Sequence, residues 1–146
     1  MEKKKISLVI PMYYEEQVAN ECYKRVKENL DKLQNYDYEI IFVNDGSKDK
    51  TLSILEEIAS NDKNVKIISF SRNFGHQAAV TAGLQYVTGD AIVIMDADLQ
   101  DPPELIPDML KLWEDGNDKI IKLISQVVVI VGNYIFSKLF VFTKKQ

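Results

Sequence analysis

Two aspartates, Asp96 and Asp98, stand at alternate positions where an apolar run ends, in the segment IVIMDADLQDPPE at 92–104. Side chains two positions apart in an extended segment point the same way, so these carboxylates share a face that Gln100 would continue. At a separation of about 6 Å the two charges repel by roughly 3 kcal/mol at an effective dielectric of 20. A hard cation such as Mg²⁺ or Mn²⁺ relieves this repulsion and also takes oxygens from a substrate phosphate. The spacing therefore predicts a metal site suited to a diphosphate.

The residues directly after this pair predict the start of a helix. Asp101 precedes Pro102, Pro103 and Glu104, which is the pattern of a helix N-cap with proline in the first turn and an acidic capping-box residue. We therefore expect a structural role for Asp101. A D-x-D sequence alone is a weak signal, and its position at the end of a strand strengthens it.

Two other polar clusters also follow apolar runs. The sequence NDGS at 44–47 has the chemistry of a tight turn that caps the next helix, although Asp45 could instead accept hydrogen bonds from a nucleobase or ribose. Arg72 stands shortly before Gly75, where a guanidinium and a helix N-terminus could face phosphate. His76, the only histidine, is expected to be a surface residue of a first helical turn.

Apolar periodicity predicts an alternating strand–helix array with an α/β fold. The expected strands are 6–10, 39–43, 65–70 and 91–95, and the expected helices are 15–33, 51–59, 75–87 and 102–113. These strands are too continuously apolar to have a wet face, so they belong in a mainly parallel sheet flanked by helices. Ligands of such open sheets bind beyond the carboxyl ends of the strands, which is where all the polar clusters lie.

Composition narrows the class of protein. The 146 residues suit one globular domain, and a formal net charge of −4 argues against a nucleic-acid-binding surface. The single cysteine, Cys22, excludes an internal disulfide and a cysteine zinc site and suggests a reducing compartment. Its position on the apolar stripe of a helix predicts a buried thiol.

The composition changes near the C-terminus. Residues 120–142 are apolar and β-branched, with a few polar interruptions, and lysines follow at 144 and 145. A helix needs about 20 mostly apolar residues to cross a bilayer, so this segment is just long enough to be a membrane helix. A fifth strand followed by a buried helix is the alternative, and the sequence leaves both open.

Four motifs, in order and at this spacing, resemble family 2 glycosyltransferases with the GT-A (Rossmann-like) fold, particularly polyprenyl- and dolichol-phosphate sugar synthases. The motifs are VIPMYYEE at 9–16, IIFVNDGSKDKT at 40–51, SRNFGHQAAVTAGLQYVTGD at 71–90 and MDADLQDPPE at 95–104. The first departs from the family pattern V-P-x-Y-N-E, because Tyr14 stands where asparagine is usual. A Rossmann-type dehydrogenase is excluded, because no G-x-G-x-x-G follows the first strand.

The resemblance implies roles for individual residues. It implies a nucleotide pocket formed by Pro11, Tyr13, Glu15, Asp45 and Asp96. It implies metal ligation by Asp96, Asp98 and Gln100, and catalytic roles for Asp98 and for Arg72 near the nucleotide-sugar. The implied reaction is Mg²⁺- or Mn²⁺-dependent transfer of a sugar from a UDP- or GDP-sugar to a polyprenyl phosphate, with inversion, at the cytoplasmic face of the cell membrane.

The chain departs from the family after WEDGNDKII at 113–121, where the family continues with the acceptor half. The tail VGNYIFSKLFVFTKK resembles the last membrane helix of GtrA-like proteins. We therefore expect an incomplete GT-A domain in residues 1–118, which binds the nucleotide-sugar, and a hydrophobic tail in 119–146. The alternative function is that of a truncated, catalytically inactive fragment that retains only nucleotide-sugar or partner binding.

Overall fold

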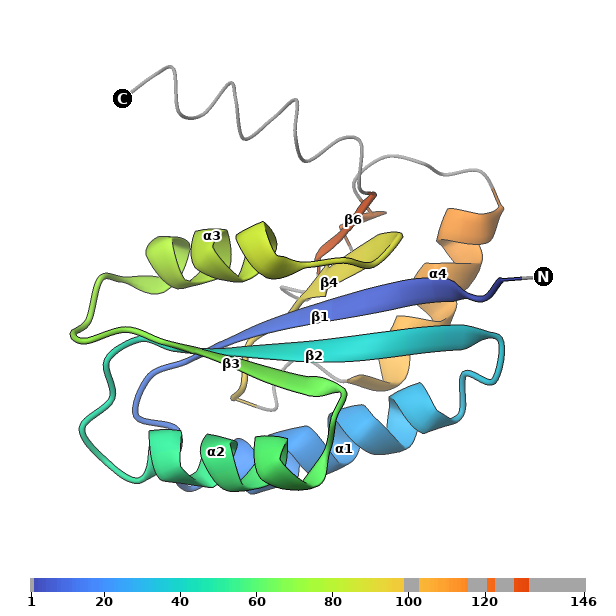
Figure 1. Ribbon diagram of the computed structural model, residues 1–146. Coiled ribbons are helices and arrows are strands. Elements are labelled where there is room, and N and C mark those ends of the chain that lie inside the picture. The colour runs from blue at the N-terminus through green and yellow to red at the C-terminus, as the bar shows by residue number, and fades with distance from the viewer. Residues whose placement is uncertain (1, 99–102, 116–120, 123–127, 132–146) are drawn as a thin grey trace, which may run out of the picture.

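The computed structural model describes residues 2–98, 103–115, 121–122 and 128–131. Strands and helices alternate along most of this length (Figure 1). The elements are β1 (Lys4–Met12), α1 (Ala19–Asp31), β2 (Tyr36–Asn44), α2 (Thr51–Asn61), β3 (Val65–Ser69), α3 (His76–Tyr86), β4 (Ala91–Ile94), the 3₁₀ helix η1 (Pro103–Leu105), α4 (Ile106–Glu114), β5 (Ile121–Lys122) and β6 (Val128–Val131).

The strands form one sheet in the order β3-β2-β1-β4-β6-β5. The four strands β3, β2, β1 and β4 run parallel, whereas β6 is antiparallel to β4 and β5 is antiparallel to β6. Helices α1, α2 and α4 cover one face and α3 covers the other (Figure 1). The predicted α/β fold with a mainly parallel sheet flanked by helices is thus confirmed.

Both faces of the central strands are buried, as their unbroken apolar sequences predict. On β1, Leu8 packs toward α1, α2 and α4, while its neighbour Val9 packs toward α3. Helix α3 lies very close to the sheet, because a Cβ at Gly83 would come within 2.4 Å of the Val9 Cγ1 atom. Cys22 on α1 is 1% exposed, and burial, the largest cause, raises its pKa to about 12, so the prediction of a buried thiol is confirmed.

The predicted elements are present with shifted boundaries, and two of the shifts have clear physical reasons. Strand β1 continues through Pro11 to Met12, beyond the predicted stop at the proline. The Val9 carbonyl accepts from the Met95 amide at 3.1 Å, and β4 pairing ends at Ile94, so Pro11 faces an edge where no ladder partner remains. The missing proline N–H therefore breaks no hydrogen bond.

Helix α1 begins at Ala19 instead of the predicted residue 15, because residues 16–18 form a turn over the Glu15 carbonyl. The predicted helix 102–113 is present as η1 followed by α4. The expected N-cap, Asp101, lies outside the described residues.

Of the two alternatives for 120–142, the structure agrees with the strand and not with a continuous membrane helix in the part of this segment that it describes, because β5 and β6 lie there. The β-branched run of β6 pairs with the outer edge of β4, from Ala91 opposite Val131 to Ile94 opposite Val128. In the ranges that the structure describes, no helix is long and apolar enough to span a bilayer. The likeness of the tail to GtrA-like proteins falls mostly outside those ranges and stays a prediction.

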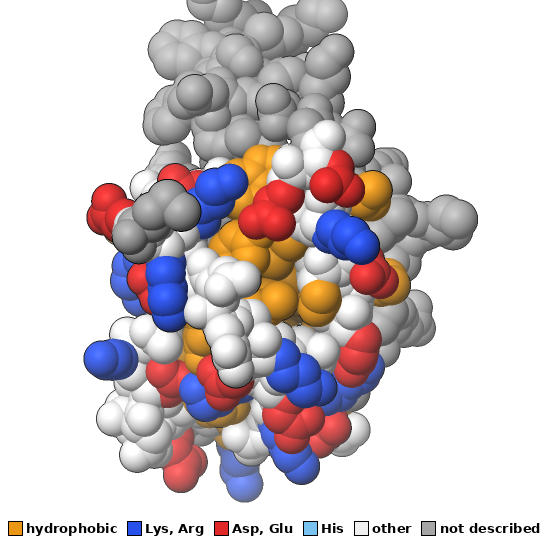
Figure 2. Space-filling model, turned by 90° about the vertical axis from the view of Figure 1, so that its right-hand side faces the viewer, with side chains coloured by type: hydrophobic (Ala, Val, Ile, Leu, Met, Phe, Trp, Pro, Cys, Tyr) orange, Lys and Arg blue, Asp and Glu red, His pale blue; other side chains and the backbone are white. Residues whose placement is uncertain are grey.

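A buried carboxylate links β1, β2 and β3 at the end of the sheet opposite the strands' carboxyl ends. Glu39 on β2, 2% exposed, accepts hydrogen bonds from the Ser7 hydroxyl at 2.6 Å and the Thr88 amide at 2.7 Å. The Lys66 ammonium lies 2.6 Å away and the Lys5 ammonium 3.3 Å. Burial raises the pKa of Glu39, but hydrogen bonds from Lys66, Ser7 and Thr88 outweigh it and lower the pKa to about 2. On the surface at this end, acidic and basic side chains are interspersed around a hydrophobic centre (Figure 2).

The turn after β2 packs backbone to backbone against the loop before α3, and this contact requires glycine. Gly46 has a φ of +72°, and a Cβ there would lie 2.2 Å from the Arg72 carbonyl carbon and 2.4 Å from the Asn73 nitrogen. Backbone atoms cannot rotate away as a flexible side chain can. The two loops are therefore fixed relative to each other.

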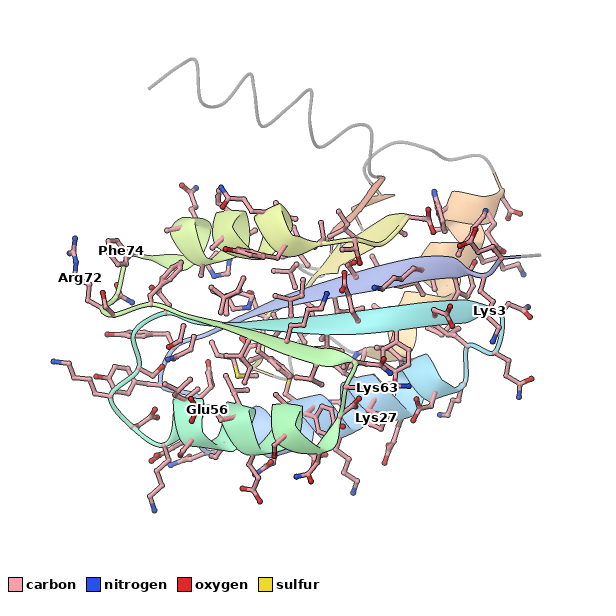
Figure 3. The ribbon with its side chains drawn as sticks, in the orientation of Figure 1. Lys3, Lys27, Glu56, Lys63, Arg72 and Phe74 are labelled. Carbon is pink, nitrogen blue, oxygen red and sulfur yellow. The ribbon has the colours of Figure 1, made fainter. Side chains whose placement is uncertain are left out.

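We expect Glu39→Gln to lower the free energy of unfolding at pH 7 by about 3 kcal/mol, because it leaves buried donors and the Lys66 ammonium without their carboxylate. Since the folded pKa of about 2 lies below the ordinary value of 4.5, this stabilisation is present above pH 4.5 and is lost as pH falls toward 2. Chemical denaturation between pH 2 and 7 should show a flatter acid limb for Glu39→Gln. Glu56→Gln, at an exposed site on α2 (Figure 3), is the control; equal losses for both variants would contradict this account.

We expect Gly46→Ala to lower the free energy of unfolding by on the order of 3 kcal/mol, because it adds a backbone clash to an unfavourable φ. The matched control is Gly75→Ala, where φ is +102° but nothing lies within 4 Å of the added Cβ, so only backbone strain of about 1–2 kcal/mol applies. Denaturant melts of both variants measure the difference. A loss below about 1 kcal/mol for Gly46→Ala would show that the loops can separate freely.

Candidate functional site

The carboxyl ends of β1, β2 and β4 lie near the start of α3 (Figure 1). Residues from these segments line a cleft of about 410 Å³. It is lined by Pro11, Met12, Tyr13, Glu15, Asp45, Asn73, Gly75, His76, Asp96, Ala97 and Asp98. Segments far apart in the sequence thus meet at the sheet edge where the polar clusters were predicted to converge. Parallel α/β sheets characteristically bind ligands at this edge.

Asp45 is the most deeply buried of the four carboxylates that line the cleft. It is 3% exposed, and its Oδ1 accepts from the Phe74 amide at 2.8 Å. Its Oδ2 accepts from the Gly75 amide at 3.1 Å and from the Asn73 side-chain amide at 3.0 Å. The carboxylate therefore fixes the loop that leads into α3. This is a structural role in a tight turn, and the predicted contact to a nucleobase stays a prediction.

The loop after β1 is tied to the turn after β2 in the same way. The Tyr14 amide donates to the Ser47 hydroxyl and the Glu15 amide donates to the Thr51 hydroxyl, each at 3.0 Å. Tyr14 has a φ of 53°, a left-handed conformation that asparagine adopts more readily than tyrosine. This conformation gives a physical reason for the asparagine that is usual here in the family pattern. The turn presents Tyr13 and Glu15 to the cleft.

Three carboxylates of the cleft lining, Glu15, Asp96 and Asp98, lie close enough to affect one another electrostatically. Burial is the largest cause that raises the pKa of Glu15, and the negative charges of Asp98, Asp49 and Asp96 raise it further. Asp96 is half-buried and Asp98 is exposed, and both line the cleft as their spacing predicted. Such mutual repulsion is what a bound cation would relieve.

The donor set fits a hard divalent cation that completes its coordination with ligand oxygens. Carboxylate oxygens of Asp96 and Asp98 are the ligands that Mg²⁺ and Mn²⁺ prefer. Among the described residues no group of three or more His, Cys, Asp or Glu side chains could hold a metal alone. Gln100, the third predicted ligand, lies outside them.

His76 lies beside Asp96 in the cleft, although its neighbours in the sequence give no sign of this contact. Its Nε2 is 3.8 Å from Asp96 Oδ1, and its side chain lines the cleft although it is 62% exposed. The predicted surface position in a first helical turn is correct for the exposure of His76, but the local sequence does not predict its place in the cleft. The signal was available, because a helix that starts at the ligand-binding edge presents its first turn to that edge.

Arg72, expected beside the nucleotide-sugar, does not line the cleft. Its guanidinium carbon lies 4.2 Å from the centre of the Phe74 ring, and both side chains project from the loop before α3 (Figure 3). All the other predicted site residues that the structure describes are in the lining. They are Pro11, Tyr13, Glu15, Asp45, Asp96 and Asp98.

Comparison with curated proteins places these features in a family. The family described as Glycosyl transferase family 2 matches residues 7–138. The chain is 54% identical over 114 residues to the uncharacterized glycosyltransferase YkcC of Bacillus subtilis, which covers 78% of the chain and 35% of that protein. It is 48% identical over 117 residues to the prophage bactoprenol glucosyl transferase homolog of Escherichia coli, covering 80% of the chain and 38% of that protein. The chain thus spans little more than a third of these relatives.

Solved structures share the fold at low sequence identity. The mannosyltransferase PcManGT from Pyrobaculum calidifontis, in complex with GDP-Man and Mn²⁺, gives a TM-score of 0.77 at 16% identity, over 94% of this chain and 47% of that one. The glucosyl-3-phosphoglycerate synthase of Mycobacterium tuberculosis, with Mn²⁺, UDP and phosphoglyceric acid, gives 0.61 at 23% identity, over 82% and 42%. With the family match extending over most of its length, the chain belongs to glycosyl transferase family 2.

Proposed function

We propose that this chain binds a UDP- or GDP-sugar together with Mg²⁺ or Mn²⁺ and transfers the sugar, with inversion, to a polyprenyl phosphate. The observation that carries the proposal is the convergence of Glu15, Asp96 and Asp98 on one cleft at the ligand-binding edge of the sheet. Relatives named bactoprenol glucosyl transferases support the lipid acceptor, and structures with the same fold contain Mn²⁺ with GDP-Man or UDP.

Asp96 and Asp98 would hold the metal, with Gln100 as a further ligand. When bound, the metal would neutralise the diphosphate that leaves with the nucleotide. Asp98 would thereby act directly in catalysis, and Asp96 would serve both metal and nucleotide. The negative charge that raises the pKa of Glu15 supports this placement of a cation.

The nucleoside would lie toward the loop after β1 and the turn after β2. Pro11 and Tyr13 give the cleft an apolar wall there, and the Tyr13 ring is 47% exposed. Glu15 and Asp45 supply carboxylate oxygens that could accept from base or ribose donors. Because Asp45 already holds the loop before α3, it would order this wall as well as contact the ligand.

A phosphate acceptor suits a site that would act without a general base, by positioning the substrates and stabilising charge. A phosphate monoester has a second pKa of about 6, so it is largely a dianion at pH 7 and needs no general base. Attack by a phosphate oxygen on the anomeric carbon, opposite the departing diphosphate, inverts that carbon in one displacement. Positioning and electrostatic stabilisation would then supply most of the rate enhancement. A polyprenyl acceptor would place the reaction at the cytoplasmic face of the cell membrane.

A second candidate function is nucleotide-sugar binding without transfer. It is favoured by the cleft lining, which contains the carboxylates proposed for the donor and the metal but does not contain Arg72. The donor cleft is formed by described residues before position 99, so binding and transfer can be measured as separate properties.

We expect Asp98→Asn to weaken Mn²⁺-dependent binding of the UDP- or GDP-sugar by about 10- to 100-fold, because the amide replaces an anionic metal ligand. Titration calorimetry with each nucleotide-sugar, with and without Mn²⁺, measures this loss. Asp108→Asn, at an exposed carboxylate of α4 outside the cleft lining, should bind like the wild type. Equal affinity of Asp98→Asn and wild type would contradict the metal assignment.

We expect the full chain to form a sugar-linked polyprenyl phosphate when given Mn²⁺, the nucleotide-sugar that it binds and a polyprenyl phosphate in detergent. A radiolabelled sugar that partitions into organic solvent measures the transfer. Metal-dependent donor binding without any labelled lipid would reject the transferase function and select the second candidate.

A further inference from the structure

An arginine and two phenylalanines form a stacked group on the loop between β3 and α3. The Arg72 guanidinium carbon lies 4.2 Å from the Phe74 ring centre, and the Phe74 ring meets Phe70 edge to face at 5.5 Å. We call Arg72, Phe74 and Phe70 the arginine–phenylalanine stack. Figure 3 shows Arg72 and Phe74 projecting together from one end of the molecule, whereas Lys63 lies on the connection that leads into β3.

The stack is held in a defined place relative to the cleft. The Phe74 amide donates to Asp45 at 2.8 Å, and the backbone at Arg72 packs against Gly46 too closely to admit a Cβ. Asn73 and Gly75, on the same loop, line the cleft. The stack therefore stands at the rim of the cleft, on a loop anchored by a buried carboxylate.

The negative charge of the cleft lining gives the nearby Arg72 guanidinium a possible role in binding an anion. Its described lining contains four carboxylates and no lysine or arginine. A metal on Asp96 and Asp98 would neutralise one anionic group, the diphosphate of the donor. A second anion brought to the same cleft needs a separate positive partner, and Arg72 is adjacent in the chain to a lining residue.

The stack also presents apolar surface beside its charge. Phe74 is 51% exposed and belongs to neither core cluster, so about half of its apolar ring surface is open to solvent. A guanidinium lying over a ring uses its face for that contact and retains in-plane N–H groups, which suit two oxygens of a phosphate. Charge and apolar surface together match an amphiphilic anion.

We infer that the arginine–phenylalanine stack is the docking point for the acceptor, with Arg72 binding the phosphate of a phosphorylated apolar alcohol and Phe74 contacting the first part of its hydrocarbon chain. The inference rests on the proposed function for the identity of the acceptor. It assigns Arg72 to the acceptor and leaves the donor to the cleft proper.

The test is titration of the full chain with farnesyl phosphate, in the presence of Mn²⁺ and UDP or GDP, below the concentration at which the lipid forms micelles. Wild type should bind farnesyl phosphate and should bind farnesol and inorganic phosphate at least about tenfold more weakly, because each lacks half of the recognised chemistry. Arg72→Gln should weaken farnesyl phosphate binding about tenfold, and Phe74→Ala several-fold. Arg72→Lys, which keeps the charge and loses the planar fork, should fall between wild type and Arg72→Gln.

Three controls separate this role from others. Nucleotide–Mn²⁺ affinity should be unchanged in Arg72→Gln, and the melting temperature of this exposed variant should match that of wild type. Lys63→Gln removes a distant exposed charge, and Lys48→Gln removes an exposed charge on the neighbouring turn. Both should bind farnesyl phosphate like wild type.

Several results would overturn the inference. Unchanged farnesyl phosphate affinity in Arg72→Gln would do so, as would an equal loss in Lys48→Gln. Loss of nucleotide affinity in Arg72→Gln would assign this arginine to the donor instead. Equal binding of inorganic phosphate would reject the role of Phe74. Farnesyl phosphate binding that depends on Arg72, without sugar transfer, would reject the proposed reaction and retain the docking point.

Discussion

The geometry of the cleft depends on the hydrogen bonds that the Asp45 carboxylate accepts from the loop before α3. This carboxylate lies at the end of a central strand and accepts from two backbone amides and one side-chain amide of that loop. Gly46 beside it lets the two loops meet backbone to backbone. Because that loop carries both cleft-lining residues and Arg72, one buried carboxylate sets the positions of the proposed donor and acceptor contacts. Hydrogen bonds to a charged group of this kind are strong and expensive to break.

Glu39 and Glu15 lie at opposite ends of the sheet, and their surroundings shift their pKa values in opposite directions. Donors from strands β1 and β3 and from the loop before β4 surround Glu39 and lower its pKa, so this carboxylate holds these segments together. Glu15 is partly buried with other carboxylates nearby, and its pKa is raised. The first arrangement is electrostatically complete within the protein, whereas in the proposed function a cation would complete the second. That contrast separates a structural charge from a candidate functional one.

The sequence predicts the fold well, because long apolar runs and helical periodicity are local signals that the packing reinforces. The alternate spacing of Asp96 and Asp98 likewise predicts their shared cleft. Features that depend on distant partners are not predictable in this way. Pro11 stays within β1 only because β4 has already ended, and the position of His76 depends on where α3 meets the sheet. At 128–131 the sequence allows both helix and strand, and the open edge of β4 decides for the strand.

The central claim is that Asp96 and Asp98 hold a divalent cation with a nucleotide diphosphate in the cleft. Paramagnetic broadening by Mn²⁺ of backbone amide NMR signals, recorded on the full chain with UDP or GDP, tests it most directly. If the cation binds there, signals of His76 and Ala97 should broaden first, while those of Glu39 and Thr88, away from the cleft, should stay sharp. Uniform broadening, or broadening centred on the Glu39 end of the sheet, would contradict it.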